Sequence, residues 1–267
     1  MVTPISQSAM RTILERAQTH VLNLLKGQEE CLSLLSLAHL IIIETYEEDF
    51  PYRLGGTCFL IRYCDMYFIV STLHGCRNLN YSPEDILYVP NATSKFAFSY
   101  DSVVKGKYEY ETDKKEDFVM LRIYDTAENR NALSQLSCKN IGLQKDVCLI
   151  RDVKDLFTRG YLYEWDSNAI DYDNKKILMR AYSTNGIETI ATSQWEGCYW
   201  VKFINPKPDF ICGHPNGMSG APVFGLKNDG TTGLFGMIIE HDLISDKFLI
   251  LGVEVLNSAL RQDYEPS

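Results

Sequence analysis

The sequence lacks several features that would assign it to common protein classes. Lys and Arg number 26 against 35 Asp and Glu, a formal net charge of −9, so the excess of positive charge on which nucleic-acid binding relies is missing. No apolar run reaches the roughly 18 residues of a membrane span. Residues 1–8 lack the charged, apolar and small-residue regions of a signal peptide. We therefore expect a cytoplasmic protein that binds neither nucleic acid nor membrane.

Cysteine is present, but not in the spacing of a metal site. None of the eight cysteines forms a Cys-x-x-Cys pair, and the triplet Cys212-Gly213-His214 has no evident second pair of ligands. We expect no structural zinc and no cofactor, and in the cytoplasm the thiols are expected to be reduced.

The composition is that of an ordinary globular protein, with 45% hydrophobic and 23% charged residues over 267 positions. Between residues 7 and 26 apolar side chains recur at steps of three and four, which predicts an amphipathic helix. A second, shorter helix is predicted over residues 29–38. We therefore place an N-terminal helical extension at residues 1–38 and one main domain at 39–267.

The helical extension has two interpretations. As a functional element it would be an inhibitory or regulatory segment, or a docking face for a regulatory protein partner. As a structural element it would pack against the main domain. The sequence leaves both open.

From Leu40 onward the pattern changes to short strands separated by turn residues. The predicted strands include 40–45, 146–150, 176–182 and 198–203, with a hairpin turn over 62–66. A polar stretch over about 125–145, in which residues 126–133 form a short helix or a connection, divides the β-rich region into two parts.

The stretch that bears most directly on chemistry is Gly217-Met218-Ser219-Gly220-Ala221-Pro222-Val223-Phe224. Two glycines around a serine suit a sharp turn that exposes the hydroxyl, and a backbone without Cβ atoms allows N–H groups to converge on an oxyanion. Ser219 is the candidate nucleophile, and Gly217 and Ser219 are the candidate oxyanion-hole donors. The same pattern also occurs in turns that have no catalytic role.

Two upstream stretches favour the catalytic interpretation. His74 follows the apolar strand 68–73, and Asp117 precedes the largely apolar stretch 118–123. His, Asp and Ser together supply a base, an orienting carboxylate and a nucleophile. Asp101 and Asp113 are rival orienting residues, but neither precedes an apolar strand in this way.

These three motifs resemble those of the chymotrypsin-like (trypsin-fold) serine proteases, particularly the intracellular and HtrA-like branch. The stretches 55–61 and 234–239 resemble the family's strands before the histidine and after the serine, so the likeness covers about residues 38 to 258. The sequence departs from the family pattern around these motifs, with the departures at Cys58, Gly75-Cys76, Met218 and Ala221. None of them replaces a catalytic atom.

The resemblance implies an all-β fold of two six-stranded antiparallel β-barrels, which would meet near residues 125–145. It also implies a terminal helix at residues 254–260. It places the substrate-binding residues at Gly213, His214, Ile239, Glu240 and His241. No aspartate lies near Gly213 and His241 stands where a glycine often keeps the pocket open, which favours a small, apolar or acidic side chain before the scissile bond. His214 and His241 are equally open to a structural role. The resemblance also leaves open a disulfide between Cys58 and Cys76, where secreted relatives carry one.

The first functional hypothesis is therefore a serine endopeptidase that hydrolyses protein or peptide substrates through His74, Asp117, Ser219 and an acyl-enzyme. Two alternatives remain. One is a latent protease that a partner activates, and the other is a catalytically silent peptide-binding module of the same fold.

Overall fold

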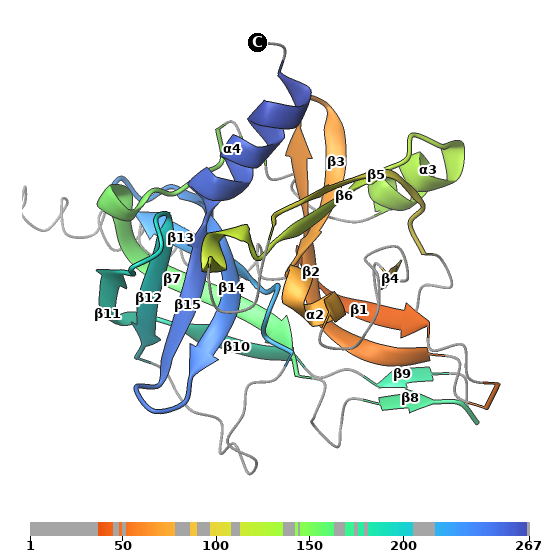
Figure 1. Cartoon of the computed structure of the whole chain (residues 1–267), viewed down its shortest axis with the longest axis horizontal. Coiled ribbons are helices and arrows are strands. Elements are labelled where there is room, and N and C mark those ends of the chain that lie inside the picture. Colours follow the sequence, from red (N-terminus) through yellow and green to blue (C-terminus); the bar gives the residue numbers. More distant parts are fainter. Residues whose placement is uncertain are drawn as a thin grey trace, which may run out of the picture.

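The computed structural model describes residues 37–44, 48–49, 52–77, 86–89, 97–107, 113–135, 142–143, 145–162, 169–173, 176–178, 181–204 and 217–265. The helical extension predicted over residues 1–38 lies outside these ranges, apart from its last two residues. Most of the described chain is β-strand, arranged in antiparallel sheets, as the sequence predicts (Figure 1).

The first half of the domain forms a six-stranded sheet in the order β4-β1-β2-β3-β6-β5. Its strands are β1 (Ala38–Glu44), β2 (Tyr52–Tyr63), β3 (Met66–Ser71), β4 (Ile86–Val89), β5 (Tyr100–Lys105) and β6 (Val119–Ile123). The hairpin between β2 and β3 turns at Cys64 and Asp65, which both have positive φ, 46° and 63°. A two-residue turn of this kind matches the twist of the strands that it joins.

The second half forms a seven-stranded sheet in the order β10-β7-β13-β14-β15-β12-β11. Its strands are β7 (Val153–Tyr161), β10 (Ala181–Asn185), β11 (Ile187–Thr192), β12 (Cys198–Phe203), β13 (Pro222–Lys227), β14 (Thr232–Asp242) and β15 (Lys247–Gly252). A separate ribbon pairs β8 (Ala169–Asp171) with β9 (Lys176–Leu178). Between the two sheets the chain forms helix α3 (Ala127–Gln135) and the short 3-10 helix η4 (Ile150–Asp152).

Two of the predicted strands are placed differently in the structure. The stretch 146–150 is not a strand, because Val147 forms only an isolated bridge to Leu234 and Ile150 begins η4. The segment instead passes close to Gly233 of β14, where an added Cβ would come within 2.6 Å of the Val147 backbone. Cys148 is buried, whereas Ile150 is exposed. The predicted strand 176–182 is divided between β9 and β10. An apolar run therefore did not by itself identify a continuous strand at either place.

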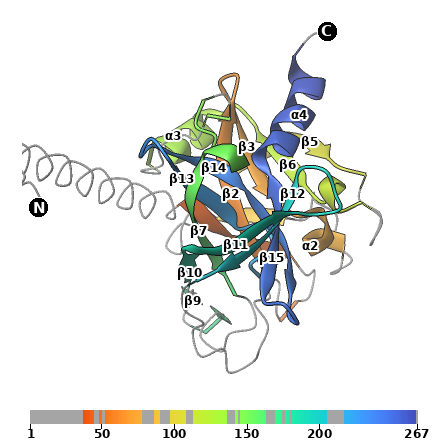
Figure 2. The same cartoon turned by 90° about the vertical axis from the view of Figure 1, so that its left-hand side faces the viewer.

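The two sheets share a hydrophobic core. Phe59 and Phe68 of the first sheet belong to the same buried cluster as Phe157 and Phe224 of the second, together with Leu256 of helix α4 (Val253–Tyr264). Figures 1 and 2 show α4 running across the junction of the sheets. The C-terminal helix therefore helps to fix one sheet relative to the other.

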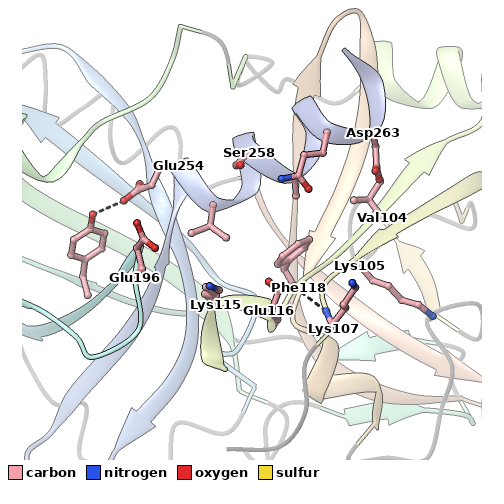
Figure 3. Close-up of a pocket in the computed structure, with 15 residues that line it drawn as sticks. Val104, Lys105, Lys107, Lys115, Glu116, Phe118, Glu196, Glu254, Ser258 and Asp263 are labelled. Atoms are coloured by element: carbon pink, nitrogen blue, oxygen red, sulfur yellow. Dashed lines mark hydrogen bonds between the residues drawn. The ribbon is translucent and has the colours of Figure 1, made fainter. Parts of the chain in front are cut away.

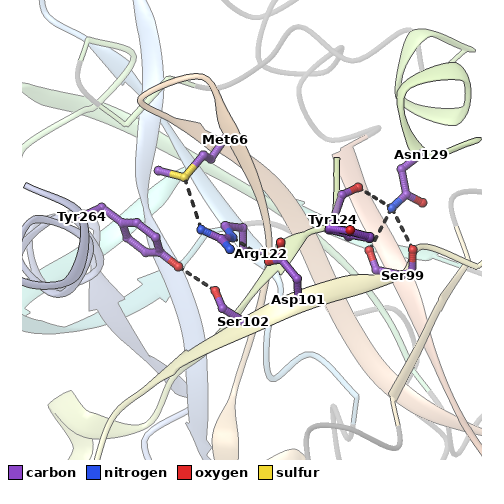
Figure 4. Close-up of polar contacts among 8 residues, drawn as sticks. All are labelled: Met66, Ser99, Asp101, Ser102, Arg122, Tyr124, Asn129 and Tyr264. Atoms are coloured by element: carbon purple, nitrogen blue, oxygen red, sulfur yellow. Dashed lines mark hydrogen bonds and ion pairs between the residues drawn. The ribbon is translucent and has the colours of Figure 1, made fainter. Parts of the chain in front are cut away.

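Polar contacts fasten the helices to the outer strands of the first sheet (Figure 4). Tyr264 of α4 shares a hydrogen bond of 2.7 Å with Ser102 of β5, and its ring packs against Phe68 at 5.4 Å. The side-chain amide of Asn129 in α3 donates to the carbonyls of Ser99 at 3.0 Å and Tyr124 at 2.7 Å. Asn129 is buried, so these bonds satisfy the NH₂ group of an amide that water does not reach.

Four cysteines are free thiols in the structure: Cys58, Cys64, Cys148 and Cys198. Cys58 is fully buried, and burial raises the pKa of its thiol well above its ordinary value. The disulfide that the resemblance left open between Cys58 and Cys76 is therefore not formed. Among the described residues, no helix combines the length and apolar character that crossing a membrane requires.

Candidate active site

The His74 ring is held by Asp117 at two points. Asp117 Oδ1 accepts a hydrogen bond from the backbone N–H of His74 at 2.9 Å, and Oδ2 lies 2.6 Å from His74 Nδ1. The Asp117 side chain is 1% exposed and that of His74 is 19% exposed. An ionised carboxylate only accepts hydrogen bonds, so Nδ1 carries the proton and Nε2 is directed away from Asp117. This is the tautomer that a general base acting through Nε2 requires.

Local structure explains how these two residues meet. His74 is the second residue of α2 (Leu73–Arg77), which follows the end of β3. Asp117 caps the C-terminus of the 3-10 helix η3 (Lys114–Glu116) and precedes β6, which pairs with β3. β3 ends where the antiparallel strand β6 begins, with Ser71 paired to Val119. His74 follows the end of β3 and Asp117 precedes the start of β6, so the two residues lie at the same end of this strand pair. The strand begins two residues after Asp117, at Val119.

The rival aspartates have other partners. Asp101 accepts from Arg122 Nε at 2.6 Å, and Asp113 lies 3.6 Å from Lys115 Nζ. Of the three aspartates considered from sequence, Asp117 is therefore the one whose carboxylate contacts His74.

Ser219 lies in a turn shaped by two glycines. Gly217 and Gly220 have φ values of 101° and 87°, in the region that side chains disfavour. The backbone N–H of Gly220 donates to Ile238 O of β14 at 2.8 Å, so the turn is anchored to the second sheet. Met218 is 1% exposed, whereas Ser219 keeps partial exposure. The turn buries the residue before the serine and leaves the serine accessible.

The same turn packs against the first sheet. Thr57 Oγ1 of β2 lies 2.7 Å from Gly217 O, and Ser71 Oγ at the end of β3 donates to Thr57 O at 2.9 Å. A Cβ added to Gly220 would come within 2.0 Å of Thr57 O and 2.6 Å of Ser71 Oγ. The structure thus brings the serine turn to the end of β3, from which His74 follows three residues later.

The predicted substrate-binding residues are placed unevenly. Gly213 and His214 lie outside the described residues. The Ile239 side chain is 2% exposed and belongs to the core. Glu240 forms an ion pair of 2.8 Å with Lys114 of η3, and His241 Nε2 lies 3.2 Å from Asp246 while its ring packs on Phe248 at 4.5 Å. The side chains of Ile239, Glu240 and His241 thus contact other parts of the protein. The main chain of these residues is the part that we consider for substrate binding.

The strand partners of β14 change along its length. Its pairing with β13 ends at Met237, followed by the Ile238 N–H bond to Ala221 O at 2.9 Å. Its pairing with β15 shifts register between Ile238 and Glu240 and continues to Asp242.

A groove of about 810 Å³ lies between α4 and the end of β5 (Figure 3). Glu116 and Phe118 line it, whereas Asp117 between them directs its carboxylate to His74. Lys105 and Lys107 lie on one side and Glu254 on the other, where it accepts a hydrogen bond from Tyr199. Burial and Glu254 raise the pKa of Tyr199. Ser219 is not among the lining residues, so the groove and the serine turn are different places.

Residues that the motifs did not single out also shape the site. Thr57 and Ser71 are polar residues at buried positions of β2 and β3, 0% and 4% exposed. A hydroxyl at a buried strand position is the sequence signal that could have identified them, because such a group needs a partner. Among the described residues, no group of three or more His, Cys, Asp or Glu side chains is arranged to hold a metal ion.

The chain matches no protein-family model. No curated protein matches it either. A similar solved structure is described by the words "Aromatic interactions drive the coupled folding and binding of the intrinsically disordered Sesbania mosaic virus VPg protein"; it is 14% identical, with a TM-score of 0.44 over 86% of this chain and 90% of that chain. Similarity of this size carries no argument about function.

Proposed function

We propose that the protein is a serine endopeptidase that uses Ser219 as nucleophile, His74 as general base and Asp117 as the residue that orients the base. The observation that carries this proposal is the two-point hydrogen bonding of His74 by the buried Asp117 carboxylate. An aspartate that fixes both the backbone and the ring of a histidine sets its orientation and its tautomer.

The chemistry follows from these roles. The Ser219 hydroxyl oxygen would attack the carbonyl carbon of a peptide bond while His74 Nε2 takes the hydroxyl proton. The N–H groups of Gly217 and Ser219 would stabilise the resulting oxyanion. His74 would then give the proton to the leaving amine as the C–N bond breaks, which leaves an acyl-enzyme. Water, activated by the same histidine, would hydrolyse the ester and restore Ser219.

We extend the proposal to the fold and to substrate binding. The two sheets would correspond to the two barrels of a chymotrypsin-like protease, with the second barrel carrying one strand more than six. Residues 239–242 of β14, where the resemblance places substrate-binding residues, would pair with the substrate main chain, because an extended peptide can bind a strand through main-chain hydrogen bonds. The proposed setting is the cytoplasm, and the proposed partner is a protein or peptide substrate.

The test is labelling with a fluorophosphonate probe, which phosphonylates an activated serine. We expect labelling of the wild-type chain, and loss of labelling in Ser219→Ala and in His74→Ala. Ser258→Ala is the matched control, because Ser258 lines the groove beside α4. Peptide mapping should place the adduct on Ser219. An adduct on Ser258 would move the reactive site to the groove.

A folded wild-type chain that stays unlabelled would contradict an assembled, active triad. The alternative of a silent peptide-binding module would then be examined by titrating candidate peptides into the wild-type chain. Binding that is lost when β14 is altered, without any cleavage, would support that alternative.

A further inference from the structure

The Thr57 hydroxyl connects both sheets to the serine turn. Thr57 lies in β2 and is 0% exposed. Its Oγ1 is 2.7 Å from Gly217 O and 2.8 Å from the backbone nitrogen of Tyr161 in β7. One hydroxyl thus joins the first sheet, the second sheet and the residue two positions before Ser219.

The direction of both hydrogen bonds is fixed by chemistry. The Tyr161 N–H can only donate, so Thr57 Oγ1 accepts from it. The single hydroxyl proton is then donated to the Gly217 carbonyl, which can only accept. Thr57 therefore satisfies one buried donor and one buried acceptor at the same time, and no other rotamer of the hydroxyl proton serves both partners.

The backbone of the same residue contacts the turn on the other side of the serine. Thr57 O accepts from Ser71 Oγ at 2.9 Å, and it lies 2.0 Å from the position that a Cβ on Gly220 would occupy. Thr57 thus packs against Gly217 with its side chain and against Gly220 with its carbonyl. These two glycines flank Ser219.

We propose that Thr57 is a positioning residue for the turn that carries the nucleophile. Its hydroxyl holds the peptide unit between Gly217 and Met218, which contains the Gly217 carbonyl and the Met218 N–H, and so restrains the backbone directly before Ser219. A residue without Cβ at φ 101° has rotational freedom that the turn itself does not remove. This inference rests on the proposed function, because it assigns a role within the same site.

The test compares two buried threonines in the full-length protein. Thr57→Val removes the hydroxyl at nearly constant volume. Thr158→Val is the matched control, because Thr158 is also 0% exposed and its Oγ1 donates to Pro222 O at 2.8 Å, beyond the serine turn. Thr57→Ser is the rescue variant, because it keeps the hydroxyl. Peptide hydrolysis, the rate of fluorophosphonate labelling and thermal unfolding are measured for all three.

We expect Thr57→Val to lower kcat and the labelling rate by roughly 10- to 100-fold, the range for a misplaced catalytic group, with KM changed less than about threefold. A positioning role acts on the transition state, so the loss belongs in kcat. Thr57→Ser should recover kcat to within about threefold of wild type. Thr158→Val should shift the midpoint of thermal unfolding by about as much as Thr57→Val does, because each variant removes one buried hydroxyl. Its kcat should stay near that of the wild type.

Equal kcat values for folded Thr57→Val and Thr158→Val would overturn the positioning role while leaving the proposed function intact. If Thr57→Val does not fold, the pair Thr57→Ala and Thr158→Ala provides the same comparison without a branched side chain. A wild-type chain whose labelling does not depend on Ser219 would overturn the proposed function, and the role of Thr57 with it.

Discussion

Asp117 holds His74 through both of its carboxylate oxygens, one on the backbone N–H at 2.9 Å and the other 2.6 Å from the ring nitrogen Nδ1. The hydrogen bond to the backbone N–H fixes the position of the His74 main chain, and the hydrogen bond to Nδ1 fixes the orientation of the imidazole ring. Because Asp117 is 1% exposed, water competes little for either bond. This geometry leads to the first prediction.

Asp117→Asn should lower kcat for peptide hydrolysis by roughly 10³- to 10⁴-fold, because the neutral amide no longer favours the Nδ1-protonated ring or its cation. The matched control is Asp113→Asn, because Asp113 lies four residues before Asp117 and its carboxylate contacts Lys115. Circular dichroism would check that both variants fold. An Asp117→Asn enzyme with wild-type kcat would show that the carboxylate does not support the base.

Gly220→Ala should unfold more readily than Gly230→Ala, although both glycines have nearly the same φ, 87° and 84°. An added Cβ at Gly230 meets nothing within 4 Å, so only backbone strain of about 1–2 kcal/mol applies. At Gly220 the Cβ would also meet the Thr57 carbonyl oxygen at 2.0 Å, which adds about 1–3 kcal/mol of overpacking. Denaturant unfolding measures the difference, and equal losses would mean that the turn moves away from β2 at little cost.

Glu240 and Lys114 form an ion pair of 2.8 Å that connects β14 to η3, three residues before Asp117. With side-chain exposures of 39% and 14%, the pair should contribute less than about 1 kcal/mol of coupling in a double-mutant cycle. If its role is structural, Glu240→Gln and Lys114→Met should lower kcat by similar, few-fold factors for all substrates. A change of preference among side chains before the scissile bond, confined to Glu240→Gln, would instead assign Glu240 to specificity.

Alkaline pH should destabilise the protein through its buried thiols. Burial raises the pKa of Cys148 from 9.0 to about 12. Between these values the unfolded chain has lost the thiol proton and the folded chain has kept it, so the free energy of unfolding falls by about 1.4 kcal/mol per pH unit for each such thiol. Below pH 9 the thiol is protonated in both states and contributes no pH dependence.

Urea unfolding between pH 8 and 11 would measure this slope. Cys148→Ala should reduce it by the contribution of one thiol. A slope that is the same in wild type and Cys148→Ala would mean that the thiol ionises without unfolding.

The sequence by itself determined the β-rich class, the order His74, Asp117 and Ser219, and the glycine-framed turn. These features are local: apolar alternation selects strands, and Gly217 and Gly220 are required wherever φ is positive. Residue types and chain order likewise distinguished a candidate nucleophile and base. Strand β12 also lies where the sequence pattern predicted it, and helix α4 lies where the resemblance placed a terminal helix.

The sequence favoured Asp117 over Asp101 and Asp113, but only the tertiary structure brought the Asp117 carboxylate to His74 and gave Asp101 and Asp113 the partners Arg122 and Lys115. It also placed Ile239 in the core and Glu240 on Lys114, which sequence had assigned to a pocket. The tertiary structure also determined the contacts of Thr57, since its hydrogen-bond partners Gly217 and Tyr161 are 160 and 104 residues away in the sequence. Contacts over such separations depend on how two sheets pack together, and no local pattern encodes them.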